Sequence, residues 1–256
     1  MVTFTLLAVF ADAVAKDPLE MDPTRRLLPP IPGHPLGTDA LGRDLWSRIA
    51  HGSRWSLGLA AVATLLIAAL GITLGTLAGY LGGWTDVVLM RAVDVLLAFP
   101  GLLLALAIVG VRGPGLENAL LAVVAIGWAD YARIVRGSTL GVREREFVLA
   151  ARGLGASDLR ILTSHVLPNV IPTVAVLATL EMGQLILAFA SLGFLGLGVK
   201  PPTPEWGSMI NEGRISFFVA PWPVICPGLA IGLAVLGFNL LGDGLRDALD
   251  PRRLTR

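Results

Sequence analysis

Few side chains in this sequence are of the types that carry out chemistry, and their spacing excludes the commonest kinds of site. The only lysines are Lys16 and Lys200, and Val199 stands where a phosphate-binding loop needs a glycine before its lysine. The histidines and the single cysteine lie far apart in the chain: His34, His51, His165 and Cys226. No spacing among them is typical of a metal site. The sequence therefore predicts no catalytic residue, no metal site and no nucleotide site of its own.

One acidic side chain, Glu181, stands in an otherwise uncharged apolar stretch of 30 residues, 170–199. Gln184 follows about one helical turn later, on the same face of a helix. A charge in the middle of a membrane costs ~3 kcal/mol on insertion scales, so such a group faces the interior of a helix bundle or water. Two alternatives stay open. Glu181 and Gln184 line a translocation path and meet an ammonium group or a metal ion, or they form a buried hydrogen bond between helices.

The composition indicates that these residues belong to an integral membrane protein. Hydrophobic residues make up 54% of the 256 residues, charged residues make up 15%, and the mean hydropathy is +0.73. Soluble domains carry about 25% charge, so a soluble enzyme and a disordered chain are disfavoured. The net charge of +1 gives no reason to expect nucleic acid as a partner. Strict two-residue alternation is absent, which predicts an all-α fold in the lipid bilayer.

Apolar stretches suited to membrane-crossing helices recur along the chain. Such a helix needs roughly 20 residues. Five stretches approach or exceed this length: Trp55–Gly79, Val95–Val111, Ala119–Val135, Val170–Val199 and Val219–Gly242. Residues 1–15 are apolar, too short to span and without the features of a signal peptide, so we expect part of a first transmembrane helix whose beginning is missing. We therefore predict five or six transmembrane helices, a polar segment at 16–54 and a transmembrane domain at 55–256.

The distribution of Lys and Arg sets the expected orientation in the membrane. One side holds eleven of these residues, mainly in a long polar insert at about 138–169 and in the C-terminal tail, and the other side holds nine. The insert and the C-terminus are therefore expected in the cytoplasm, and the segment 16–54 is expected outside.

Two further patterns concern packing between helices. Asp130 and Arg133 are three residues apart near the end of a span and are expected to form a local ion pair. Gly71, Gly75 and Gly79 recur at four-residue spacing on one face of a spanning helix, which allows close packing in lipid. Their partner is either another helix of this chain or a second membrane subunit, and both alternatives stay open.

The polar insert reads as a hairpin of two short helices. The first helix contains residues 146–152 and ends near Gly153–Gly155. The second begins at Ser157 as N-cap with Asp158 in its first turn, and it is expected to stop before Pro168. Small residues gather at the bend, where they let another surface approach the backbone: Ala150, Ala151, Gly153, Gly155 and Ala156. The alternative is a packed loop without a partner.

This hairpin resembles the EAA loop of ABC importer permeases, which docks into a groove of an ATPase subunit. The residues that match the family pattern are Ala150, Ala151, Gly155, Leu167 and Pro168. Leu149 stands where the family usually has Glu, and His165 stands where it usually has Ile. The resemblance implies a set of ATPase-coupling residues: Ala150, Ala151, Gly153, Gly155, Ala156, Ser157 and Asp158.

Further motifs, in one order along the chain, resemble the dipeptide, oligopeptide and nickel group of these permeases. They occupy five ranges: His34–Asp44, Asp94–Pro100, Phe194–Gly198, Pro201–Gly207 and Phe238–Pro251. The resemblance covers roughly residues 16–256 and implies the transmembrane domain of a type I ABC importer. Peptides are the expected substrate. Nickel stays open because of Leu149 and the region around Glu181 and Gln184.

The same resemblance implies the assembly in which the chain works. It implies a heterodimer with a paralogous permease in the bacterial inner membrane, an extracytoplasmic solute-binding protein, and two ATPase subunits that bind ATP and Mg. The alternative is an ion-gradient-driven transporter or a channel that acts without an ATPase. Such proteins place several ionisable groups at mid-membrane, and this chain offers essentially Glu181.

Overall fold

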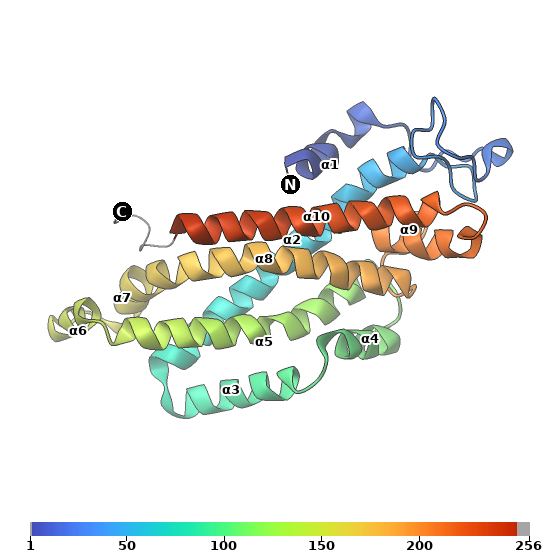
Figure 1. Cartoon of the computed structure of the whole chain (residues 1–256). Helices are drawn as coiled ribbons and strands as arrows, with labels where there is room; N and C mark the ends of the chain where they lie inside the picture. Colours follow the sequence, from blue (N-terminus) through green and yellow to red (C-terminus); the bar gives the residue numbers. More distant parts are fainter. Residues whose placement is uncertain (1, 250–256) are drawn as a thin grey trace.

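Helices form the whole architecture of the computed structural model, which describes residues 2–249 (Figure 1). In this part of the chain, four helices are long and apolar enough to cross a membrane, and a bent pair adds a fifth crossing if it counts as one span. The four helices are α2 (Leu45–Leu81), α5 (Leu116–Arg143), α8 (Leu167–Phe194) and α10 (Trp222–Leu249). An apolar helix that is too short to span, α1 (Val2–Val14), precedes them. The predicted all-α membrane fold is confirmed.

The bent pair replaces the single straight span predicted at Val95–Val111. Helix α3 (Gly83–Leu97) and helix α4 (Gly101–Arg112) meet at an angle of 86°. Pro100 stands between them with φ −59° and ψ 120°, outside the helical region. Proline has no N–H for the helix ladder, and its ring disfavours a helical conformation of the residue before it. Apolar residues continue on both sides of the break, so hydropathy alone does not reveal it.

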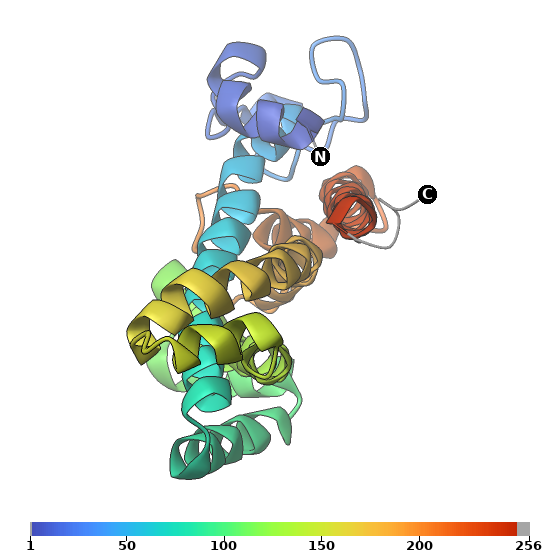
Figure 2. The ribbon, with the colours of Figure 1, turned by 90° about the vertical axis from the view of Figure 1, so that its left-hand side faces the viewer.

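Helix α2 runs obliquely across the other helices, from α1 at one edge to α3 at the other (Figure 2). Its 37 residues correspond to about 55 Å. The helix begins where the Asp44 carboxylate accepts a hydrogen bond from the Ser47 N–H (2.8 Å). It ends at Gly82, whose φ of +66° is a conformation that other residues rarely adopt. Along its length α2 also contacts α5, α8, α9 (Trp206–Gly213) and α10.

The three glycines on α2 pack against α5 of the same chain. A Cβ atom built at Gly71 would lie 2.2 Å from the Cβ of Tyr131, and one built at Gly79 would lie 2.8 Å from the Cβ of Thr139. Gly75 lies between them and is equally close to the α5 backbone. Of the two alternatives for this small-residue face, the structure supports packing within the chain.

The two ends of the helix bundle carry different segments (Figure 1). The hairpin, with α6 (Glu146–Gly153) and α7 (Asp158–Ile161), lies at the end where α10 also finishes. The polar segment 16–54 and the connection 195–221 with α9 lie at the opposite end, as does the 3-10 turn η1 (Pro23–Arg25). The predicted insert and the predicted outer segment are therefore on opposite sides of the bundle.

Candidate functional site

The bend of the hairpin is built by two local features. Helix α6 ends at Gly153, and Gly155 follows with φ +81°, a left-handed conformation that favours glycine. Helix α7 then begins at Asp158, where the Ser157 hydroxyl accepts a hydrogen bond from the Arg160 N–H (3.4 Å). The predicted bend and its N-cap at Ser157 are confirmed.

The small residues at the bend do not all face the same way. Space is open around Gly153 and Gly155, with no atom within 4 Å of a Cβ built at either position. Ala151 and Ala156 are partly buried and pack against the hydrophobic core. Ala150 is exposed. The surface available to a partner is therefore formed by the tip of the hairpin, whereas the two core-facing alanines hold the hairpin on the bundle.

Large apolar side chains surround this tip. Leu149 is 51% exposed, Leu154 89% and Leu159 72%. Exposed apolar side chains that are grouped in this way mark an interaction surface. Leu149 takes the place at which the EAA pattern has Glu, so this part of the surface is apolar.

Three charged side chains of the hairpin contact the end of α2. The Tyr80 hydroxyl donates a hydrogen bond to Oδ1 of Asp158 (2.6 Å). The Arg152 guanidinium lies over the Tyr80 ring, 5.8 Å from its centre, and Nη2 of Arg152 is 3.4 Å from the Tyr80 hydroxyl. Arg143, at the end of α5, donates to the Gly79 carbonyl (2.9 Å) and to the Tyr80 carbonyl (3.2 Å). These contacts fasten the hairpin to the last turn of α2.

Sequence reasoning missed Tyr80, Arg143 and Arg152 as members of this site. Tyr80 and Asp158 are separated by 78 residues, and neither belongs to a motif that includes the other. Sequence reasoning also placed Asp158 among the ATPase-coupling residues without indicating that its carboxylate accepts a hydrogen bond from α2.

The hairpin passes into α8 without a loop. The predicted stop before Pro168 is wrong, because α7 continues through a π turn (η2, Leu162–Val166) into α8. In this turn the Leu167 N–H bonds to the Leu162 carbonyl, five residues back. Pro168 then stands in the first turn of α8, where a missing N–H is tolerated. The second arm of the hairpin is thus a direct extension of a long apolar helix.

A pocket of about 390 Å³ lies among α4, α5 and α8, and both polar residues predicted on a span line it. Glu181 is close to the midpoint of α8 and is partly buried, and Gln184 is exposed. Ser191 adds a third polar side chain to the same wall. Within residues 2–249, neither Glu181 nor Gln184 has a hydrogen bond or an ion pair. This favours a pocket-lining position over a buried hydrogen bond between helices.

The predicted ion pair between Asp130 and Arg133 is wrong. Arg133 reaches across to α3, where its Nη2 lies 2.5 Å from Oδ1 of Asp94, and Asp130 is exposed. A partner on a neighbouring helix replaces the one on the same helix because α3 and α5 are in contact.

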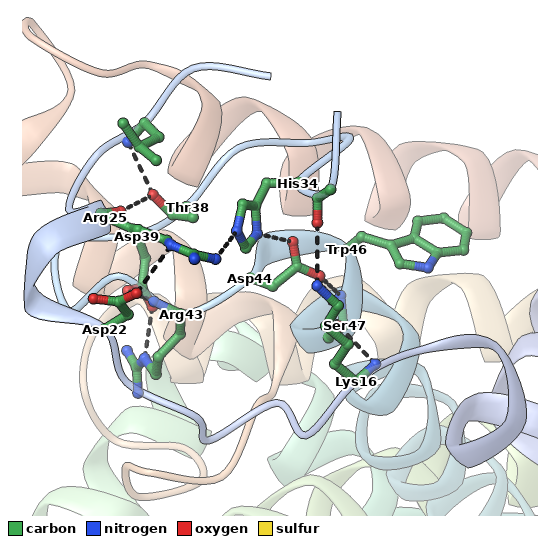
Figure 3. Close-up of polar contacts among 12 residues, drawn as sticks. Lys16, Asp22, Arg25, His34, Thr38, Asp39, Arg43, Asp44, Trp46 and Ser47 are labelled. Carbon is green, nitrogen blue, oxygen red and sulfur yellow. Dashed lines mark hydrogen bonds and ion pairs between the residues drawn. The ribbon is translucent and has the colours of Figure 1, made fainter. Parts of the chain in front are cut away.

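At the opposite end of the bundle, a polar network orders the segment 16–54 (Figure 3). His34 lies between two partners, with Nδ1 3.0 Å from Oδ1 of Asp44 and Nε2 3.3 Å from Nη1 of Arg25. Because a guanidinium only donates, Nε2 accepts and Nδ1 donates to the carboxylate. The second oxygen of Asp44 accepts from the Ser47 hydroxyl (2.6 Å), which fastens the segment to the first turn of α2.

A second network at this end joins the segment to α9. Nη1 of Arg48 lies 2.6 Å from Asp39 and 2.8 Å from Glu212, and both arginines of the network are buried. Arg43 contacts the same two carboxylates at 2.7 Å and 2.5 Å. Two cations therefore match two anions, and removing one partner would leave a buried charge uncompensated.

The start of α9 depends on Glu205, which is 1% exposed. Its carboxylate accepts hydrogen bonds from the N–H groups of Gly207 and Ser208, each at 2.8 Å. Burial raises the pKa of Glu205 above its ordinary value, and these N–H donors oppose that shift. The cap orients Trp206, whose indole N–H donates to the Ile49 carbonyl (3.1 Å).

Comparison with known proteins identifies relatives over most of the chain. Residues 71–255 match the family model described as the inner membrane component of binding-protein-dependent transport systems. The chain is 47% identical over 253 residues to the dipeptide transport system permease protein DppC of Alkalihalophilus pseudofirmus, covering 98% of this chain and 83% of that protein. It is 49% identical over 223 residues to the glutathione transport system permease protein GsiD of Pectobacterium atrosepticum, covering 87% and 74%.

Two solved structures have a similar fold at low sequence identity. One is a chain of the MetNI methionine ABC transporter in an inward facing conformation, with a TM-score of 0.64, 17% identity, and coverage of 80% of this chain and 98% of that chain. The other comes from an amino acid ABC transporter with histidines, with a TM-score of 0.57, 17% identity, and coverage of 79% and 94%. Both support the fold predicted from the sequence.

Proposed function

The chain belongs to the family of inner membrane components of binding-protein-dependent transport systems, and we propose that its substrate is a small peptide. It is a multi-pass inner membrane protein and a permease subunit of an ABC importer of the peptide group. The two named relatives are permeases for dipeptides and for glutathione, which favours peptides over nickel. The alternative of an ion-gradient-driven transporter or channel has no support among these relatives.

The proposed assembly is the one that the family resemblance implies. A paralogous permease forms a heterodimer with this chain, and an extracytoplasmic binding protein delivers the peptide. Two ATPase subunits bind ATP and Mg and supply the energy. The absence of a phosphate-binding loop in the sequence supports the assignment of ATP hydrolysis to partner subunits.

The observation that carries this proposal is the tip of the coupling hairpin, residues 138–169. Gly153 and Gly155 leave open space at the bend, and exposed leucines surround it. In the proposed orientation the hairpin and the C-terminus are cytoplasmic, and the segment 16–54 is outside. The tip then faces the compartment that contains ATP.

The pocket beside α8 is the proposed part of the translocation path. Glu181 and Gln184 line it near the middle of the helix. A carboxylate there offers a counter-charge for the ammonium group of a peptide, in a medium where an isolated charge is costly. In the alternating-access cycle, ATP closes the ATPase pair and the hairpin carries that motion to the spans. A shift from 1:99 to 99:1 between two states requires ~5.5 kcal/mol of differential binding.

Reconstitution tests the proposal. The chain is purified with its partner permease and the ATPase subunits, placed in liposomes, and supplied with binding protein and a labelled dipeptide. We expect ATP-dependent accumulation of the dipeptide. Uptake that proceeds without the ATPase subunits and follows an ion gradient would refute the proposed function.

A matched pair of variants tests the hairpin tip itself. Gly153→Ala and Gly153→Trp both keep the helical backbone, and neither meets a neighbouring atom within the chain at its Cβ. We expect Gly153→Ala to transport normally and Gly153→Trp to assemble poorly with the ATPase or to hydrolyse ATP without uptake. Gly155 is a less suitable position, because its φ of +81° would strain any side chain. Normal transport by Gly153→Trp would exclude the tip as the docking surface.

A further inference from the structure

Helix α2 connects the two ends of the bundle with a direct polar contact at each end. At one end Tyr80, in the last turn of α2, holds Asp158 and Arg152 of the coupling hairpin. At the other end Arg48, in the first turns of α2, holds Glu212 of α9 at 2.8 Å. The helix that carries both contacts is continuous over 37 residues.

The contact at Tyr80 is rigid, because packing and hydrogen bonds both hold it. The ring is 6% exposed and belongs to the hydrophobic core, so its position is set by packing. Its hydroxyl donates to a carboxylate at 2.6 Å, and hydrogen bonds to charged groups are about twice as strong as neutral ones. Arg143 holds the backbone of the same turn through the carbonyls of Gly79 and Tyr80.

The hairpin is joined to the membrane helices in two ways. It is covalently continuous with α5 at its start and, through the π turn, with α8 at its end. It also contacts α2 directly, through the hydrogen bond between Tyr80 and Asp158. A displacement of the hairpin therefore moves α5 and α8 through the chain itself and α2 through its packing on them, and the Tyr80–Asp158 bond adds a direct connection from α7 to α2.

We propose that Tyr80 is a positioning residue for transport. Its hydroxyl couples the last turn of α2 directly to α7, in addition to the packing of α2 on α5 and α8, so that events at the ATPase reach α9 and the segment 16–54 through one rigid helix. This inference rests on the proposed function as an ABC importer permease. It adds a specific transmission residue that lies outside the hairpin motif.

The test uses the complete transporter with its ATPase subunits and binding protein. Tyr80→Phe removes only the hydroxyl and keeps the packed ring. We expect the stimulation of ATP hydrolysis by peptide-loaded binding protein to fall about ten-fold, a factor that corresponds to one hydrogen bond to a charged group. Subunit stoichiometry is expected to stay unchanged, and the melting temperature is expected to fall by no more than the few degrees that one hydrogen bond accounts for. Tyr131→Phe is the matched control, since Tyr131 is the second of two tyrosines and its buried hydroxyl has no partner within the described residues.

A double-mutant cycle assigns the effect to the bond. Asp158→Ala should reduce the stimulation as Tyr80→Phe does, and the double variant should be no worse than either single one. Asp158→Asn keeps an acceptor oxygen and should retain more stimulation than Asp158→Ala.

Each possible outcome decides the question. If Tyr80→Phe keeps normal stimulation, or lowers the melting temperature while the stimulation stays unchanged, Tyr80 has no role in transmission. Additive effects of Tyr80→Phe and Asp158→Ala also refute the proposal. A wild-type complex without any stimulation or uptake overturns the proposed function first, and the inference with it. That result is distinct from a failure confined to the variants.

Discussion

Replacing Gly71 by Ala should destabilise the protein, although the same change at Gly58 of the same helix should stabilise it. The new Cβ would lie 2.2 Å from the Cβ of Tyr131, an atom next to the backbone that cannot turn away. Overpacking of this kind costs about 1–3 kcal/mol, and the fixed neighbour places Gly71 at the upper end of that range. Replacing glycine by alanine inside a helix stabilises the helix by about 1 kcal/mol. The net change in the free energy of unfolding is therefore about 2 kcal/mol, or a fall of roughly 4–8 °C in melting temperature.

Gly58→Ala is the matched control on the same helix. No atom lies within 4 Å of a Cβ built at Gly58, so only the gain in helix propensity remains. We expect its melting temperature to rise by roughly 2–4 °C. The assay is thermal unfolding of the isolated chain in detergent. Equal stability of both variants in the isolated chain, together with loss of the permease heterodimer in Gly71→Ala alone, would refute packing against α5 and place the glycine face against the second permease.

Two further predictions concern the path and the topology. If Glu181 lines the path, Glu181→Gln should change uptake or selectivity in a complex that still assembles. Glu181→Leu should reduce uptake further. Normal uptake by both variants would remove Glu181 from the site. With Cys226 replaced by serine, Arg26→Cys should react with an impermeant thiol reagent from outside the cell and Ser164→Cys should not. Both positions are exposed, and the segments that carry them, next to η1 and next to α7, lie at opposite ends of the bundle. The reverse labelling pattern would overturn the orientation.

Local sequence signals predicted the features that depend on nearby residues. Composition and apolar length predicted an all-α membrane protein, because both report directly on transfer into lipid. The Ser157 cap and the glycine bend of the hairpin were also predictable. Each is decided within a few residues, by one hydroxyl and by one position with positive φ.

Features that depend on tertiary contacts were not predictable in this way. Arg133 was expected to pair with Asp130, three residues away, but its partner is Asp94, 39 residues away on another helix. Pro168 was expected to stop a helix. Instead, a π turn precedes it, and α8 continues past the proline. A proline in the first turn and a proline that ends a helix look alike in sequence, because the difference lies in the hydrogen bonds before them.

The exposed leucines of the hairpin and its polar contacts lie at different places. The face around Gly153 carries exposed leucines, and Leu149 stands where the family pattern has an acidic residue. The polar contacts run instead to α2, from Asp158 and Arg152 to Tyr80. Docking to an ATPase groove would then depend on shape and apolar area, and transmission into the membrane on hydrogen bonds. A bulky side chain at Gly153 should consequently disturb docking to the ATPase, whereas a missing hydroxyl at Tyr80 should leave docking intact and weaken coupling.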